Sequence, residues 1–127
     1  MNTLGLIAAV TAFLSIWGGH VAVRKVEFIS RTIWLPTVMF AVFGFAAEYF
    51  SLITSSRSLS IILGILGITL LFDAFEMSRQ QKRIKKGHAP ANPNNPRHAA
   101  ILTDSNFRAT THDLLKREPT GKPIANH

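Results

Sequence analysis

Long apolar stretches with few charged residues alternate with short polar segments over the first 76 residues. Residues 3–23 carry no charged side chain, and residues 33–53 and 59–76 are nearly as apolar. About 20 apolar residues at a rise of ~1.5 Å each suffice to cross the ~30 Å hydrocarbon core of a bilayer. The first stretch differs from a signal peptide because its basic residues follow it instead of preceding it. The pattern therefore predicts an all-α membrane protein with three transmembrane helices, over about 3–23, 33–53 and 59–76.

The third helix is expected to continue beyond the membrane to about residue 86. Gly87 is a plausible C-terminal cap and Pro90 follows it. The three prolines between residues 88 and 96 predict an extended linker, and a short helix is expected at about 105–117. We divide the chain into a helical membrane domain, 1–87, and a Pro/Asn-rich, largely irregular cytoplasmic tail, 88–127. So small a tail has no core of its own, so we expect it to be disordered alone and to need a support, such as a partner chain, to be ordered.

The positions of Lys and Arg predict how the chain is oriented. Arg24, Lys25 and Arg31 lie between the first two helices, and a second basic run follows the third helix, whereas the loop between helices two and three holds only Arg57. Basic loops stay in the cytoplasm. With three spans the two basic segments share one side, so we expect a multi-pass protein with its N-terminus outside and its C-terminus in the cytoplasm.

Small residues form a stripe along each expected helix and favour close helix packing. We expect a compact three-helix bundle, although small residues are also simply common in membrane helices. The stripes are Gly5, Ala8, Ala12, Ser15 and Gly19; Ala41, Gly44, Ala47 and Ser51; and Ser60, Gly64, Gly67 and Ala74.

The third helix has a second, polar face opposite its small residues. Thr69, Asp73, Glu76 and Gln80 recur at intervals of three and four. Two interpretations stay open for the acids of this face. Either they meet water at the membrane boundary, or one of them forms an ion pair with a basic residue of the first loop, Arg24 or Lys25.

Two further polar residues lie inside the expected spans. Glu48 falls on the small-residue stripe of the second helix, and an acid within a membrane is a candidate for proton or ion handling. It is also close enough to the outer surface to be hydrated or to bond Ser51. His20, near the inner end of the first helix, is interpreted as an interhelical hydrogen-bonding residue, since a haem would need a second ligand from a partner.

Composition narrows the possible chemistry. The 127 residues include no Cys, and 14 Lys and Arg stand against 7 Asp and Glu. Phosphate-binding loops, metal-ligand spacings and nucleophile motifs are absent, so we expect neither an enzyme nor a bound cofactor or metal. The basic juxtamembrane residues are expected to contact anionic lipid headgroups or a partner. We do not expect them to bind nucleic acid, because such binding usually involves a recognition fold. They are Arg24, Lys25, Arg79, Lys82, Arg83 and Lys86.

Two stretches, Gly19 to Phe28 and Phe75 to Pro93, resemble a family of small bacterial inner-membrane proteins defined only as domain of unknown function 4491. The resemblance covers roughly residues 1–96 and implies three spans in the bacterial inner membrane but no activity. This chain departs from the family pattern at Val21 and at the pair His88 and Ala89. The matching positions are His20, Lys25, Glu27, Glu76, Gln81, Lys82, Arg83, Lys86, Gly87, Asn92 and Pro93.

Most of these matching polar residues map to the cytoplasmic boundary of the membrane. With Asp73 they predict a polar cluster there, formed by His20, Glu27, Asp73 and Glu76. Our first hypothesis is a non-catalytic membrane protein that serves as an accessory or structural subunit and binds other membrane subunits, or itself. The alternative is a small oligomeric transporter or proton-coupled channel component in which Glu48 or Asp73 titrates.

Overall fold

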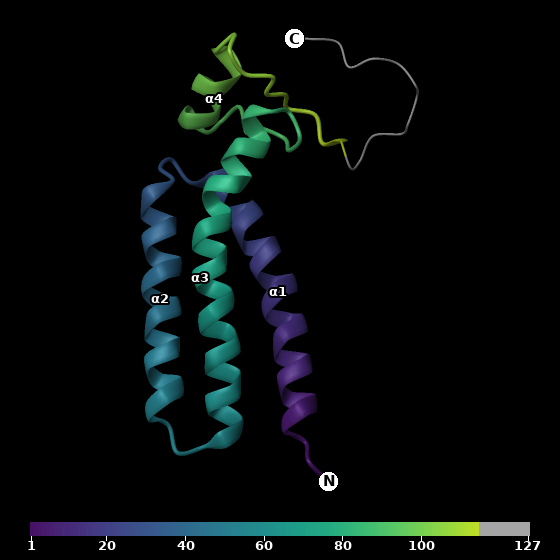
Figure 1. Cartoon of the computed structure of the whole chain (residues 1–127). Coiled ribbons are helices and arrows are strands. Elements are labelled where there is room, and N and C mark those ends of the chain that lie inside the picture. Colours follow the sequence, from purple (N-terminus) through teal and green to yellow (C-terminus); the bar gives the residue numbers. More distant parts are fainter. Residues whose placement is uncertain (115–127) are drawn as a thin grey trace.

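The fold is all-helical, and it is described for residues 1–114 of a computed structural model (Figure 1). Its helices are α1 (Leu4–Ile29), α2 (Trp34–Ile53), α3 (Arg57–Lys85) and α4 (Pro96–Thr103). The first three are each long and apolar enough to cross a membrane. The predicted fold class is confirmed: three membrane-spanning helices, a third helix that extends well past its apolar part, and a short helix after it.

The three long helices lie in a row with α3 in the middle (Figure 1). α2 and α3 form an antiparallel hairpin and α1 packs against the other side of α3, whereas α1 and α2 barely contact each other. The expected compact bundle is therefore wrong. The reason lies in α3, whose small-residue face and polar face point in opposite directions, so that each takes a different neighbour.

The row of helices has two ends of different character. The end that we call the basic end holds the connection from α1 to α2, the last turns of α3 and the residues after it, at the top of Figure 1. The N-terminus and the loop from α2 to α3 lie at the other end.

α2 and α3 pack through their small residues, as the stripes predict. A Cβ placed on Gly44 would lie 2.7 Å from Leu71 Cγ and 3.0 Å from the Gly67 carbonyl oxygen, so only glycine fits there without a shift. Near the hairpin loop, Ser51 Oγ donates to the Ser60 carbonyl at 2.8 Å and Ser60 Oγ donates to the Ser51 carbonyl at 2.9 Å. These reciprocal bonds join the two helices next to the loop that connects them.

α3 ends in a Schellman cap at Gly87, as predicted. Gly87 has φ of 77°, a conformation that glycine adopts easily, and its N–H donates to the Ile84 carbonyl at 3.0 Å. The next N–H, of His88, donates to the Arg83 carbonyl at 2.8 Å. A Cβ at Gly87 would also collide with the Arg108 carbonyl oxygen, so the position excludes any side chain for two reasons.

The described residues after Gly87 fold back on their own chain. The Arg108 N–H donates to the Lys85 carbonyl at 2.9 Å, and the Ala91 N–H donates to the Thr110 carbonyl at 2.8 Å. Lys85 Nζ lies 4.8 Å from the centre of the Phe107 ring. A small apolar core forms here from Ile84, Ala89 and Ala91, with Leu102 packed against it. Residues 88–114 therefore rest on their own chain, and support of the tail by a partner chain stays a prediction.

The short helix begins earlier than predicted. α4 starts at Pro96, in the first helical turn, and Asn95 Oδ1 accepts the Arg97 N–H at 3.1 Å as the N-cap. The window from residue 105 is not helical as far as 113, because Asp104 Oδ1 accepts the Asn106 N–H and turns the chain there. The rest of that window, 115–117, lies outside the described residues. The domain division at residue 87 stays a prediction.

Candidate functional site

The C-terminal end of α1 is held by side chains from residues 92–98. A helix leaves its last carbonyls without intrahelical donors. Asn95 Nδ2 donates to the carbonyls of Phe28, at 3.1 Å, and Ser30, at 2.9 Å, and Asn92 Nδ2 donates to Phe28 at 3.1 Å. We call the four residues that make these and the following contacts the α1 clasp; they are Asn92, Asn95, Arg97 and His98.

Arg97 completes this capping from the start of α4. Its Nη2 donates to the Glu27 carbonyl at 2.7 Å and to the Ser30 carbonyl at 3.3 Å, and its Nε donates to Ser30 at 3.3 Å. Two nitrogens of the guanidinium group, Nε and Nη2, thus donate to carbonyls at the end of α1. The planar, fixed arrangement of the guanidinium donors favours such simultaneous bonds.

The clasp closes around the carboxylate of Glu27, which is 0% exposed. Arg97 Nη1 lies 2.8 Å from Glu27 Oε1 as an ion pair, although no N–H of Nη1 points along a hydrogen bond. His98 Nε2 lies 3.1 Å from the same oxygen. Within residues 1–114, Glu27 Oε2 is buried without a hydrogen-bond partner. A buried carboxylate without these neighbours would be strongly destabilising.

The hydrogen bonds of His98 fix its tautomer. The imidazole is fully buried, and its Nδ1 accepts the Asn92 N–H at 2.9 Å. Nδ1 therefore carries no proton, so Nε2 does and donates to Glu27. The ring also packs edge-on against Phe28, with the ring centres 6.2 Å apart. His98 thus links residues 92–98 to the end of α1 through both ring nitrogens.

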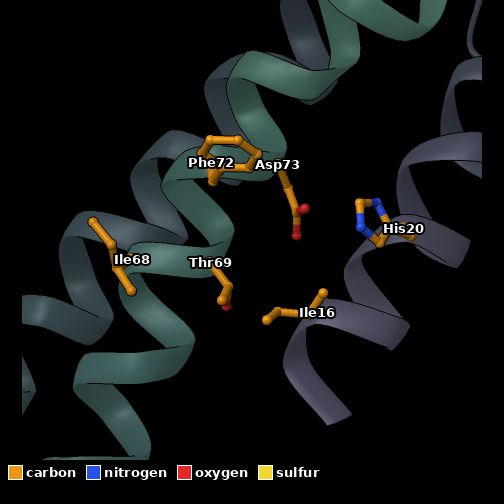
Figure 2. A pocket seen from close by; sticks show the side chains of 6 residues that line it. All are labelled: Ile16, His20, Ile68, Thr69, Phe72 and Asp73. Carbon is orange, nitrogen blue, oxygen red and sulfur yellow. The ribbon is translucent and has the colours of Figure 1, made fainter. Parts of the chain in front are cut away.

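A groove runs between α1 and α3 below the clasp. Its apolar part is a cavity of about 300 Å³ lined by the six residues that Figure 2 shows, where His20 on α1 faces Asp73 on α3. Asp73 lies directly over Gly19, since a Cβ on that glycine would collide with its carboxylate oxygens. The apolar part is lined by Ile16, His20, Ile68, Thr69, Phe72 and Asp73.

The second part of the groove lies nearer the basic end and is more polar. Its volume is about 400 Å³, and His20 lines it as well as the apolar part. The polar part is lined by Trp17, His20, Val21, Val23, Arg24, Glu76, Gln80 and Arg83.

The family model for the domain of unknown function DUF4491 matches residues 2–95 of the chain, and thus all three long helices and both asparagines of the α1 clasp. The chain belongs to this family. No curated protein and no solved structure matches this DUF4491 chain significantly. The match ends before Arg97 and His98, so the two residues that contact the Glu27 carboxylate lie just beyond the family domain.

Three residues of the predicted polar cluster of this DUF4491 protein come together and the fourth does not. His20, Asp73 and Glu76 line the α1–α3 groove. Glu27 lies apart from them, inside the clasp. The postulated ion pair between an acid of α3 and Arg24 or Lys25 is not formed among the described residues.

The basic residues near the groove make other contacts instead. Glu76 pairs with Arg79 of its own helix at 3.0 Å, and Arg24 Nε donates to the His20 carbonyl at 3.3 Å. All six basic residues predicted to contact lipid or a partner are exposed: Arg24, Lys25, Arg79, Lys82, Arg83 and Lys86.

Glu48 lies in the seam between α2 and α3. A Cβ added to Gly67 would come 2.7 Å from Glu48 Oε1, so the half-buried carboxylate covers that glycine and points into the seam, as predicted. A role for Glu48 or Asp73 in ion handling stays a prediction of the sequence. In the part of the DUF4491 chain that is described, no group of three or more His, Asp or Glu side chains could hold a metal ion.

Sequence reasoning missed the residues of the clasp. Only the resemblance marks Asn92, and no pattern in the sequence marks Arg97 or His98. One signal was available, because an Asn directly before a Pro is a frequent helix start. It would have placed the beginning of α4 at Asn95 and Pro96, but not its contacts with α1.

Proposed function

We propose that this DUF4491 protein is a non-catalytic accessory or structural subunit of a larger complex in the bacterial inner membrane. Its N-terminus lies outside and its basic end lies in the cytoplasm, where it meets other membrane subunits and anionic lipid headgroups. The observation that carries this proposal is the α1 clasp, which attaches the residues after α3 to the end of α1.

The clasp supports a docking role because of what it fixes. Glu27, Arg97 and His98 hold α4 at the basic end through an ion pair and hydrogen bonds that are buried or nearly so. A surface fixed before binding loses less conformational entropy when a partner arrives. The exposed Lys and Arg side chains around it offer charge to an acidic partner. The polar groups of the clasp bond one part of the chain to another. This role is typical of a fixed docking surface and not of a reactive centre.

We expect the chain extracted in mild detergent to co-purify with at least one other membrane protein in stoichiometric amount. Reversing two exposed charges of the basic end, Lys82→Glu with Lys86→Glu, should lower its recovery at least about tenfold, because like charges across an interface repel. The matched control is Arg57→Glu at the other end of α3, which should leave recovery unchanged. Quantitative mass spectrometry of the eluates measures both.

Two results would overturn the subunit proposal. One is a chain that purifies alone or only with copies of itself. The other is a partner whose recovery falls equally with Arg57→Glu and with the double charge reversal, because that loss would not come from the basic end.

The orientation has its own test, made simple by the absence of Cys from the sequence. In intact cells, an impermeant maleimide should label Arg57→Cys from outside and should reach Lys82→Cys only after the membrane is opened. The reverse pattern would contradict the orientation, and labelling of both from one side would contradict three spans.

A further inference from the structure

The two parts of the α1–α3 groove follow each other along the helices. Ile16, His20 and Arg24 follow each other at intervals of four on α1, so they share one face. On α3 the lining residues also recur at intervals of three and four, from Thr69 to Arg83. His20 lines both parts. The groove thus runs parallel to helices that cross the bilayer, and it changes along its length from apolar to polar.

The polar part holds two guanidinium groups with free donors. Arg24 uses only its Nε, in a bond to the His20 carbonyl, and the side chain of Arg83 has no hydrogen-bond or ion-pair partner among residues 1–114. Glu76, the acid of this part, is paired with Arg79. Guanidinium groups bind phosphate through charge-assisted hydrogen bonds. The charge of the polar part therefore fits an anion with several acceptor oxygens.

The apolar part lies deeper in the membrane than the two arginines. From Ile16 to Arg24 the helix rises by about 12 Å at 1.5 Å per residue. Ile16, Ile68 and Phe72 line this deeper part, so it fits a hydrocarbon chain. His20 lines both parts, and it faces Asp73 of the apolar part, as Figure 2 shows.

We infer that the α1–α3 groove is a binding site for one anionic phospholipid, with its phosphate between Arg24 and Arg83 and one acyl chain along Ile16, Ile68 and Phe72. A free phosphate ion would leave the apolar part empty, and an apolar helix of another protein would bury two guanidinium groups without partners. A phospholipid satisfies both parts at once. The inference rests on the lipid contact of the proposed function and deepens it, because it names one groove and one lipid class for that contact.

The test uses the purified full chain and native mass spectrometry. The chain in neutral detergent is titrated with phosphatidylglycerol or with phosphatidylcholine, and the lipids retained per chain are counted. We expect one phosphatidylglycerol to bind with clear preference over phosphatidylcholine. Arg24→Gln with Arg83→Gln should weaken that binding about thirtyfold, because each lost bond is made to a charged group.

The matched control is Lys25→Gln with Lys82→Gln, which removes the same charge from neighbouring residues that do not line the groove. It should change the affinity by no more than about threefold. Equal losses in the two double variants would overturn the site, since general surface charge would then explain binding. Absence of any preference for phosphatidylglycerol, or retention of a protein chain in place of the lipid, would overturn it too.

A second variant tests the acyl part and keeps both arginines. Ile16→Trp fills the apolar cavity and should abolish the retained phosphatidylglycerol while the circular dichroism and melting temperature stay near those of the unchanged chain. If the arginine variant does not fold, this variant decides, and full lipid retention by it overturns the site. Because no partner protein is present in these experiments, their failure would not bear on the proposed subunit function.

Discussion

Replacing Arg97 with methionine is expected to weaken the attachment of residues 92–103 to α1 by about 3–5 kcal/mol. The change leaves the fully buried Glu27 carboxylate without the guanidinium 2.8 Å away, and it removes the donors to the Glu27 and Ser30 carbonyls. Removal of one partner of a buried ion pair has a cost of this size because the remaining charge stays uncompensated. Hydrogen exchange of the Ala91 and Asn92 amides, whose acceptors are the Thr110 carbonyl and His98 Nδ1, measures the loss.

Two companion variants separate the charge from the rest of the side chain. Arg108→Met removes an exposed arginine that follows residues 92–103. It should alter the free energy of opening, as measured by hydrogen exchange, by no more than about 0.5 kcal/mol. Adding Glu27→Gln to Arg97→Met removes the uncompensated charge but keeps an oxygen that can accept from His98 Nε2. The double variant should therefore recover a large part of the loss. A loss below about 1 kcal/mol in Arg97→Met, or no recovery in the double variant, would show that Glu27 is not held as an ion pair.

The helices themselves follow from local features of the sequence. The length of each apolar stretch sets the minimum length of its helix, and the exposed apolar side chains of α1 and α2 agree with a lipid environment. Gly87 could be identified as the end of α3 because a left-handed residue there has a strong preference for glycine. The first helix was predicted too short, since α1 continues through Arg24 and Lys25 to Ile29. The first charged residues mark where a helix leaves the membrane, but the helix itself can continue beyond them.

The clasp could not be predicted because its partners are far apart in the sequence. Polar or small residues that recur every three or four positions indicate which side chains share one face of a helix. Such a pattern contains no information about a partner 70 positions later in the sequence. Glu27 therefore looked like one more acid at the membrane boundary, next to Asp73 and Glu76. Its partners distinguish it, because Arg97 and His98 contact the Glu27 carboxylate, whereas Asp73 is buried without an ion pair to any described residue. The row of helices, instead of a bundle, was missed for a related reason: the two faces of α3 were recognised but not assigned to different neighbours.

The clasp and the α1–α3 groove depend on the same helix. The clasp fixes the end of α1 through carbonyls at residues 27, 28 and 30, and the polar part of the groove is lined by α1 residues about one to three turns earlier. Arg24 therefore lies on a helical turn whose following residues are held by the clasp. Residues 92–103, none of which is among the lining residues of the groove, help to determine the position of one of the two guanidinium groups that we assign to the phosphate.

Replacing Gly44 with leucine is expected to destabilise the α2–α3 hairpin by about 1–3 kcal/mol. Its Cβ alone would lie 2.7 Å from Leu71 Cγ and 3.0 Å from the Gly67 carbonyl oxygen, and that carbonyl belongs to the α3 backbone. Because the backbone cannot rotate away as a side chain does, the helices must separate, and overpacking of this kind has a cost of that order. The separation should also strain the reciprocal bonds between Ser51 and Ser60. Unfolding of the purified chain in a titration with sodium dodecyl sulfate, followed by circular dichroism, gives the change in stability.

The matched control for this overpacking is Gly18→Leu. Gly18 is also a glycine within a long helix, but a Cβ there would meet nothing within 4 Å. The substitution adds the same volume and removes the same low helix propensity, so it should leave stability unchanged or raise it by up to about 1 kcal/mol. Gly44→Ala, which adds only the Cβ, should fall between the unchanged chain and Gly44→Leu. Equal stability of Gly18→Leu and Gly44→Leu would contradict close packing of α2 on α3, because only one of the two glycines faces another helix.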